Sequence, residues 1–102
     1  MIQIKVNAGQ GAERRVHELC DALRHARVWS IADRRCTRNL QLKHSSGTVQ
    51  GSIRRIQSKD PEVLAFDCRA KDEAQEAITA GRFVNLVLRD LPAVSDISLH
   101  RR

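Results

Sequence analysis

Apolar and polar residues alternate in several short stretches of the chain, which is the pattern of half-buried β-strands. In residues 2–7, Ile2, Ile4 and Val6 alternate with polar residues. Residues 28–35 have more continuous apolar content, which is typical of a strand that is partly buried on both faces. Together these patterns predict strands over residues 2–7, 28–35, 39–44, 48–56, 62–70 and 94–100.

Two longer segments repeat apolar residues at three- and four-residue steps, the spacing of one helix face. They predict helices over residues 11–27 and 72–90, and Asp72 with Gln75 three residues later is close to a capping box. Gly81 offers an alternative in which the second helix ends there and residues 83–88 form a strand. We favour the continuous helix because residues 83–88 do not alternate.

The order of the predicted elements indicates an α+β fold. Strand, helix, several strands, helix and strand is the ferredoxin-like βαββαβ order, an antiparallel sheet with two helices on one face. The middle of the chain is longer than two strands need, so we expect an extra hairpin there. A chain of 102 residues supports one hydrophobic core, and we therefore predict a single α+β domain over residues 1–102.

Two runs of residues resemble ACT domains, which are ferredoxin-like regulatory domains. The opening run consists of Ile4-Lys5-Val6, then Gly9 and Gly11, then Val16, Leu19 and Leu23, and then Val28-Trp29-Ser30-Ile31. The closing run is Leu91-Pro92-Ala93-Val94-Ser95-Asp96-Ile97, which is similar to the helix-to-strand ending of such domains. The resemblance implies a regulatory domain in which Gly9, Gln10 and Gly11 border a small anionic ligand.

Positive charge is concentrated in the first part of the chain. Of the net charge of +6, residues 1–59 contribute +8 and residues 60–102 contribute −2. Fourteen of the eighteen cationic residues are arginines, whose planar guanidinium suits phosphate and carboxylate groups. This composition favours an anionic partner, either a nucleic acid or an acidic protein, although a solvated arginine-rich surface has the same composition.

The candidate nucleic-acid-binding residues are eight of the twelve cations of this first part. They are Arg24, Arg27, Arg34, Arg35, Arg38, Lys43, Arg54 and Arg55. If the hairpin and the strand over residues 28–35 are neighbours, these side chains form one basic edge that neutralises phosphates. Because Phe66 and Phe83 lie on predicted core faces, we expect contact with the phosphate backbone and not with the bases.

A second candidate site is the glycine turn before the first predicted helix. Gly9, Gln10 and Gly11 precede a helix whose first backbone N–H groups could hold a carboxylate or phosphate, with Arg14 in the first turn as an additional cation. The alternative is a plain turn, since the same glycines are needed to connect a strand to a helix.

Motifs for catalysis or for metal binding do not stand out. His17 and Cys20 lie three residues apart, but a structural zinc site needs four ligands at motif spacing, and Cys20 and Cys68 fit apolar core faces better. Cys36 lies among arginines that could lower its pKa, although no base lies near it in the sequence. We therefore predict no cofactor, no metal site and no enzymatic activity.

The leading functional hypothesis is a non-enzymatic regulatory or assembly module. It would bind a small anionic effector and form a homodimer through an edge strand or a helix face. The alternative is an RNA- or DNA-binding module that uses the arginine-rich first half. No run approaches the roughly 20 apolar residues that a membrane span requires, so we expect a cytoplasmic protein without a membrane partner.

Overall fold

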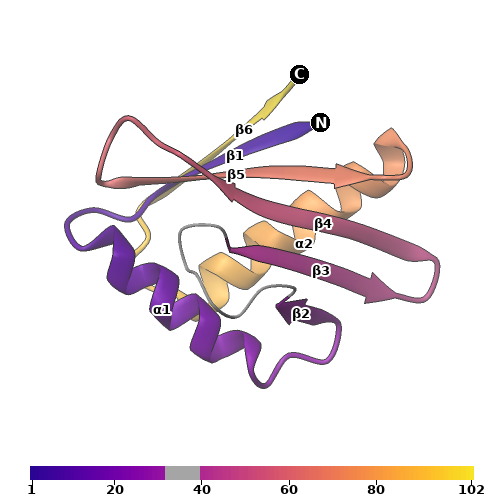
Figure 1. The fold of residues 1–102 in the computed structure, drawn as a ribbon, viewed down its shortest axis with the longest axis horizontal. Coiled ribbons are helices and arrows are strands. Elements are labelled where there is room, and N and C mark those ends of the chain that lie inside the picture. The colour runs from indigo at the N-terminus through magenta and orange to yellow at the C-terminus, as the bar shows by residue number, and fades with distance from the viewer. Residues whose placement is uncertain (32–39) are drawn as a thin grey trace.

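The computed structural model describes residues 1–31 and 40–102, and it confirms the α+β class. The elements follow one another as β1 (Ile2–Asn7), α1 (Ala12–Leu23), β2 (Trp29–Ile31), β3 (Gln41–Ser46), β4 (Val49–Ile56), β5 (Val63–Ala70), α2 (Glu73–Asp90) and β6 (Asp96–Arg101). Figure 1 shows these elements, with the two chain ends side by side at the ends of β1 and β6.

All strand pairs form one antiparallel sheet in the order β2-β3-β4-β5-β1-β6. This six-stranded order differs from the four-stranded order of a ferredoxin-like sheet. The edges are β2, which has three residues, and β6, which has six. Gly47, at a φ of 61°, provides the tight turn between β3 and β4.

One face of the sheet carries the hydrophobic core. Alternate residues of each strand point to it, so that Ile4, Leu42 and Ile53 are fully buried against the two helices. Helix α1 contributes Val16, Leu19 and Leu23, and α2 contributes Phe83. Each such aliphatic or aromatic side chain contributes about 1.5–3 kcal/mol of burial free energy, so this face fixes the orientation of every strand.

The aromatic side chains meet inside this core. Phe83 lies edge-to-face against Phe66, with ring centroids 4.9 Å apart, and against Trp29 at 6.0 Å. The prediction that Phe66 and Phe83 belong to the core is confirmed. These two residues and Trp29 are the chain's only Phe, Trp or Tyr side chains, so none of them remains for the other face of the sheet.

The predicted start and continuity of the second helix are confirmed. Asp72 is the N-cap of α2, and its Oδ1 accepts a hydrogen bond from the Gln75 backbone N–H at 2.8 Å. The Gln75 side chain accepts from the Gln50 backbone N–H on β4, so it joins the helix start to the sheet. Gly81 lies inside the helix, and the alternative strand over residues 83–88 is wrong.

The first helix ends earlier than predicted, at Leu23 and not at residue 27. The backbone N–H groups of Arg24, His25 and Ala26 bond to carbonyls three residues back, which tightens the last turn and ends the regular helix. This turn brings the chain round to β2, where Trp29 is buried. Residues 32–35 of the predicted second strand lie outside the described residues. β1 has the predicted bounds, and β3, β4, β5 and β6 differ from prediction by at most two residues at either end.

Candidate functional site

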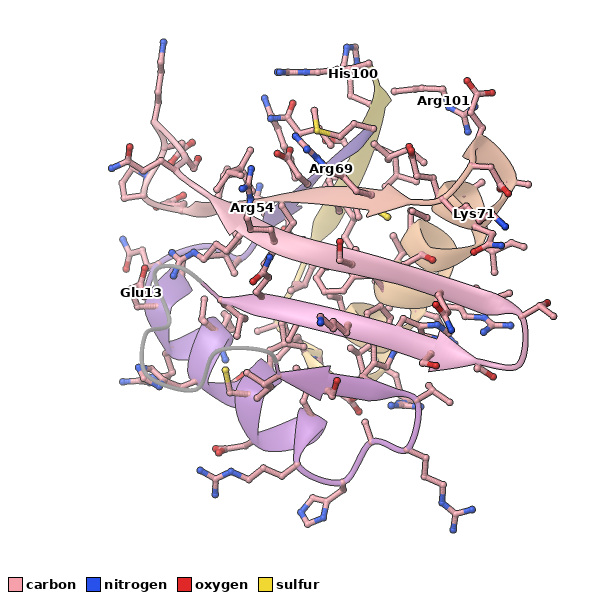
Figure 2. All side chains as sticks on the ribbon, turned by 45° about the vertical axis from the view of Figure 1, so that its right-hand side comes forward. Glu13, Arg54, Arg69, Lys71, His100 and Arg101 are labelled. Atoms are coloured by element: carbon pink, nitrogen blue, oxygen red, sulfur yellow. The ribbon has the colours of Figure 1, made fainter. Side chains whose placement is uncertain are left out.

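The face of the sheet opposite the helices carries a group of exposed cations. Residues on this face alternate with the core residues of the same strands, and Figure 2 looks onto it, with Arg54 and Arg69 labelled. Lys5, Lys43, Arg54 and Arg69 are exposed there. We call these four residues the basic face. They come from β1, β3, β4 and β5, so the sheet brings together cations that lie far apart in the sequence.

The strand register places three of these cations next to one another. Lys43 pairs with Ser52, which in turn pairs with Arg69. Arg54 lies two residues beyond Ser52, so it is a diagonal neighbour of both Lys43 and Arg69, at about 7–8 Å between backbones. Lys5 lies one strand further on, where it pairs with Ala65. Three of the cations are therefore neighbours across β3, β4 and β5, and Lys5 extends the positive charge to β1 beyond Asp67 and Gln3.

Acidic side chains are few on this face. Asp67 lies between Arg54 on β4 and Gln3 on β1 in the register, is 7% exposed, and has its Oδ2 3.7 Å from Arg54 Nη2. Asp96, the other carboxylate on these strands, lies at the far end of β6 opposite Asn7. The nearly buried Asp67 carboxylate holds the Arg54 guanidinium in place. The Arg54 side chain is still about half exposed, so it remains accessible to a ligand.

The basic face continues toward the edge of the sheet. Gln3 pairs with His100 on β6, and Gln3 Oε1 accepts a hydrogen bond from Arg102 Nη2 at 3.1 Å. Figure 2 shows His100 at this edge of the sheet. With the chain's aromatic core residues on the other side, this face offers charge and hydrogen bonding but no Phe, Trp or Tyr ring for stacking.

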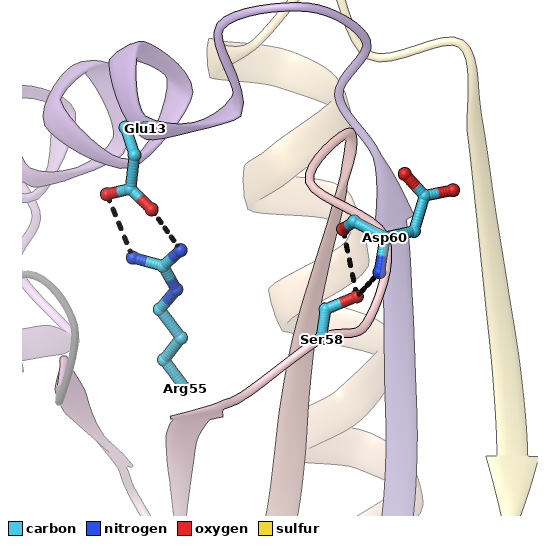
Figure 3. Close-up of polar contacts among 4 residues, drawn as sticks. All are labelled: Glu13, Arg55, Ser58 and Asp60. Atoms are coloured by element: carbon cyan, nitrogen blue, oxygen red, sulfur yellow. Dashed lines mark hydrogen bonds and ion pairs between the residues drawn. The ribbon is translucent and has the colours of Figure 1, made fainter.

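Arg55, a predicted nucleic-acid residue, lies on the opposite side of the sheet from Arg54. It pairs with Phe66 in the register, so its side chain points toward the helices. Both of its terminal nitrogens contact the Glu13 carboxylate in the first turn of α1, with Nη1 3.2 Å from Oε2 (Figure 3). Arg55 is therefore part of the contact between α1 and the sheet.

The other predicted nucleic-acid residues divide into three groups. Lys43 and Arg54 belong to the basic face. Arg24 and Arg27 are exposed after the end of α1, on the helix side of the molecule. Arg34, Arg35 and Arg38 lie outside the described residues. Of the five predicted cations within the described residues, two lie together on the uncovered face of the sheet.

Arg27 borders a cavity of about 440 Å³ between the end of α1 and α2. Arg82 and Arg89 also line this cavity, and Arg82 Nη1 lies 3.3 Å from Nε2 of the buried His44. Burial of the imidazole, together with the nearby Arg82 charge, lowers the pKa of His44. His44 therefore acts as a neutral part of the core beneath Trp29, whose ring centroid is 4.7 Å away.

The glycine turn has a structural explanation of its own. Gly9 and Gly11 have φ values of 68° and 78°, which favour glycine, and Gly11 is the N-cap of α1. The Arg14 backbone N–H donates to the Gly11 carbonyl at 2.9 Å. A cavity of about 680 Å³ near this end of α1 is lined by Glu13 and by residues of the β4–β5 region, not by Gly9, Gln10, Gly11 or Arg14. The anionic-ligand site at this turn stays a prediction.

Cys20 and Cys68 pack as small apolar residues. Cys68 is fully buried, and burial together with the nearby Glu76 raises the pKa of its thiol to about 11. Burial also raises the pKa of the half-buried Cys20. Cys36 lies outside the described residues. Within residues 1–31 and 40–102, no group of His, Cys, Asp or Glu side chains is arranged to hold a metal ion.

Neither helix of the described residues is long and apolar enough to cross a membrane. Comparisons with protein-family models, with curated proteins and with solved structures found no match for this chain.

Prediction from the sequence missed Lys5 and Arg69 as candidate binding residues. Lys5 is an isolated cation that alternates with Ile4 and Val6, and Arg69 lies in the part of the chain with net negative charge, so neither belongs to a cluster of cations in the sequence. A signal was available: in alternating strands, every cation at a polar position shares the solvent face of the sheet. Selecting cations by face would have added Lys5 and Arg69 and separated Arg54 from Arg55.

Proposed function

We propose that this protein is a non-enzymatic module that binds single-stranded RNA or DNA through the basic face of its sheet. The observation that carries the proposal is the placement of Lys5, Lys43, Arg54 and Arg69 on four adjacent strands of one uncovered face. Cations spaced in this way match a polyanion that follows the sheet surface, because each can neutralise a phosphate along the strand.

The chemistry of the face favours backbone contacts over base recognition. Stacking on sheet aromatics is a common way to read single-stranded bases, and Trp29, Phe66 and Phe83 are all committed to the core. Arg54 and Arg69 remain as planar groups that bind phosphate through two parallel hydrogen bonds. The proposal therefore predicts weak dependence on base sequence and strong dependence on salt.

A single-stranded ligand fits the shape of this face better than a duplex. The cations lie on the sheet itself, and recognition through a duplex groove uses a helix or ribbon that enters the groove. A nucleic acid is also preferred to an acidic protein, because phosphate charges repeat regularly along one chain and the cations extend over four strands. The experiment below distinguishes binding to a nucleic acid from binding to an acidic polypeptide.

We also propose that part of this fold is a ferredoxin-like unit. Omitting β2 and β3 leaves β1, α1, β4, β5, α2 and β6, whose strands lie in the order β4-β5-β1-β6. In this interpretation β2 and β3 are the extra hairpin added at the β4 edge. They widen the uncovered face by two strands, and β3 supplies Lys43 to it.

The test compares two double variants of the same charge in a fluorescence-anisotropy titration with labelled oligonucleotides. Arg54→Gln with Arg69→Gln removes two cations of the basic face. Arg24→Gln with Arg27→Gln removes two exposed arginines on the helix side and serves as the matched control. We expect the first pair to weaken binding to a single strand at least about tenfold, while the control pair stays within about threefold of wild type.

Three outcomes would contradict the proposal. These are no binding by the wild-type chain at low salt, equal losses from both double variants, and full displacement of the oligonucleotide by polyglutamate of equal charge concentration. The last result would assign the basic face to acidic polypeptides. Circular dichroism of each variant checks that the fold is intact, which is expected because all four side chains are exposed.

A further inference from the structure

The outer edge of β6 is a long strand edge without a partner among the described residues. β6 pairs with β1 on its inner side, and no other described strand lies beyond it. Five of its six residues are exposed, including Leu99 at 53%. The opposite edge strand, β2, has only three residues. An exposed six-residue edge is a template for further strand pairing.

The hydrogen-bond pattern shows which backbone groups of β6 are free to pair. The Arg102 N–H donates to the Met1 carbonyl at 2.9 Å, so this antiparallel residue pair is a hydrogen-bonded one. Because the pattern alternates, the backbone N–H and C=O groups of His100, Ser98 and Asp96 also point to β1. The N–H and C=O groups of Ile97 and Leu99 consequently point to the outer edge.

The side chains of β6 complement those of a second β6 strand that runs antiparallel to it. Residues 96–100 read Asp-Ile-Ser-Leu-His. In an antiparallel pair centred on Ser98, Ile97 lies opposite Leu99 of a second copy on the core side of the sheet. On the uncovered side, Asp96 lies opposite His100, an acceptor opposite a donor, and Ser98 lies opposite Ser98.

Helix α2 carries an apolar stripe on its side toward β1 and β6. Ala77, Val84 and Leu88 follow one another at helical spacing, and Leu88 is 57% exposed. The Glu73 carboxylate lies on the same side of the helix and is 3.6 Å from Arg101 Nη1 on β6, so the start of this stripe lies toward β6. The opposite side of α2 contacts β3 and β4 through Arg82 and Gln75.

We propose that a second copy of this chain pairs with the β6 edge, and that the two copies form a symmetric dimer with Ser98 at the two-fold axis. The sheets join into one antiparallel sheet, in which Ile97 of each copy lies opposite Leu99 of the other on the core side. The axis is perpendicular to the sheet, so both basic faces lie on the same side. The dimer itself does not depend on nucleic-acid binding.

The first test measures the oligomeric state by sedimentation, without nucleic acid. The wild-type chain should sediment as a dimer of the 11.5-kDa protomer. Leu99→Lys should raise the dimer dissociation constant at least about tenfold, because it places a charge opposite Ile97 of the other copy. Val28→Lys is the matched control at an exposed apolar residue beside the other sheet edge, and it should leave the dimer unchanged.

The second test examines the register by cross-linking. In the proposed pairing the two Ser98 residues form a non-hydrogen-bonded pair, whose Cα atoms lie about 4.5 Å apart, within the range of a disulfide. Ser98→Cys should therefore cross-link under mild oxidation. Asp96→Cys should not, because the two copies of residue 96 are about four residues, or 13 Å, apart along the strands. The wild-type chain, oxidised in the same way, is the control for cross-linking through the native cysteines.

A monomer at every accessible concentration would overturn the proposal. A dimer that Leu99→Lys leaves intact would overturn it as well, since β6 would then not be the interface. Equal cross-linking of Ser98→Cys and Asp96→Cys would exclude the Ser98-centred register. Because none of these measurements involves an oligonucleotide, their failure is distinct from a failure of the proposed nucleic-acid binding.

Discussion

The close approach of Gly51 to α2 shows how a single residue sets the distance between sheet and helix. A Cβ atom at Gly51 would lie 2.3 Å from Thr79 Oγ1 and 2.6 Å from Thr79 Cγ2. Thr79 is fully buried, so it has no open space into which to move. Gly51 therefore permits α2 to pack directly on β4.

Gly51→Ala is expected to lower the free energy of unfolding by about 1–3 kcal/mol, because the added methyl group forces the helix and strand apart. Thr79→Ala removes the two closest atoms and should recover part of this loss in the double variant. Urea denaturation of the two single variants and the double variant measures the coupling. Strictly additive effects would contradict this account of the contact.

We expect His44 to make the stability of the protein sensitive to acid. Its pKa is lowered in the folded state, so the unfolded chain takes up a proton more readily than the folded chain does. The stabilising contribution of neutral His44 is present above the unfolded pKa of 6.5 and is lost as the pH falls below that value.

His44→Leu should consequently reduce the loss of stability between about pH 7.5 and about pH 5, the range in which histidine titrates. Urea denaturation gives the free energy of unfolding of wild type and variant at both pH values. Comparing the change with pH in the two proteins removes the contribution of the carboxylates, which titrate in both. An equal loss of stability in the two proteins would show that His44 does not need to be neutral.

Each helix begins in a different way, and the cap of α2 connects it to the sheet. The Asp72 carboxylate accepts from the Gln75 N–H, while the Gln75 side chain accepts from Gln50 on β4. Asp72→Ala should lower the free energy of unfolding by about 1 kcal/mol, since it leaves a backbone donor of the first turn without its partner. Asp72→Asn retains the acceptor and serves as the control in thermal denaturation. Equal losses in both variants would argue against a capping role.

The elements were predictable from the sequence where local periodicity determines them. Residues 2–7 alternate because one side of β1 is buried, and the Asp72 cap and the absence of alternation in residues 83–88 marked α2 as one helix. The end of α1 was not predictable in this way. Ala26 continues the apolar spacing, but the chain turns after Leu23 so that Trp29 reaches the core, and that contact depends on tertiary packing.

At the scale of the whole molecule, the candidate site depends on which strands are neighbours. The alternation in β1 and β5 places Lys5 and Arg69 on a polar side, and this much is local information. Their proximity to Lys43 and Arg54 follows from the order β3-β4-β5-β1, which long-range packing determines. A cluster of cations in the sequence is consequently a poor guide to a cluster in space, as the opposite directions of Arg54 and Arg55 show.

The salt dependence of oligonucleotide binding tests the central claim most directly. If the four cations of the basic face each contact a phosphate of a single strand, the logarithm of the association constant should fall with the logarithm of salt concentration at a slope of about −3. Arg54→Gln with Arg69→Gln should reduce that slope by about 1.4, while Arg24→Gln with Arg27→Gln should leave it unchanged. A slope near zero for the wild-type chain, or one that only the Arg24 and Arg27 variant reduces, would contradict the proposed role of the basic face.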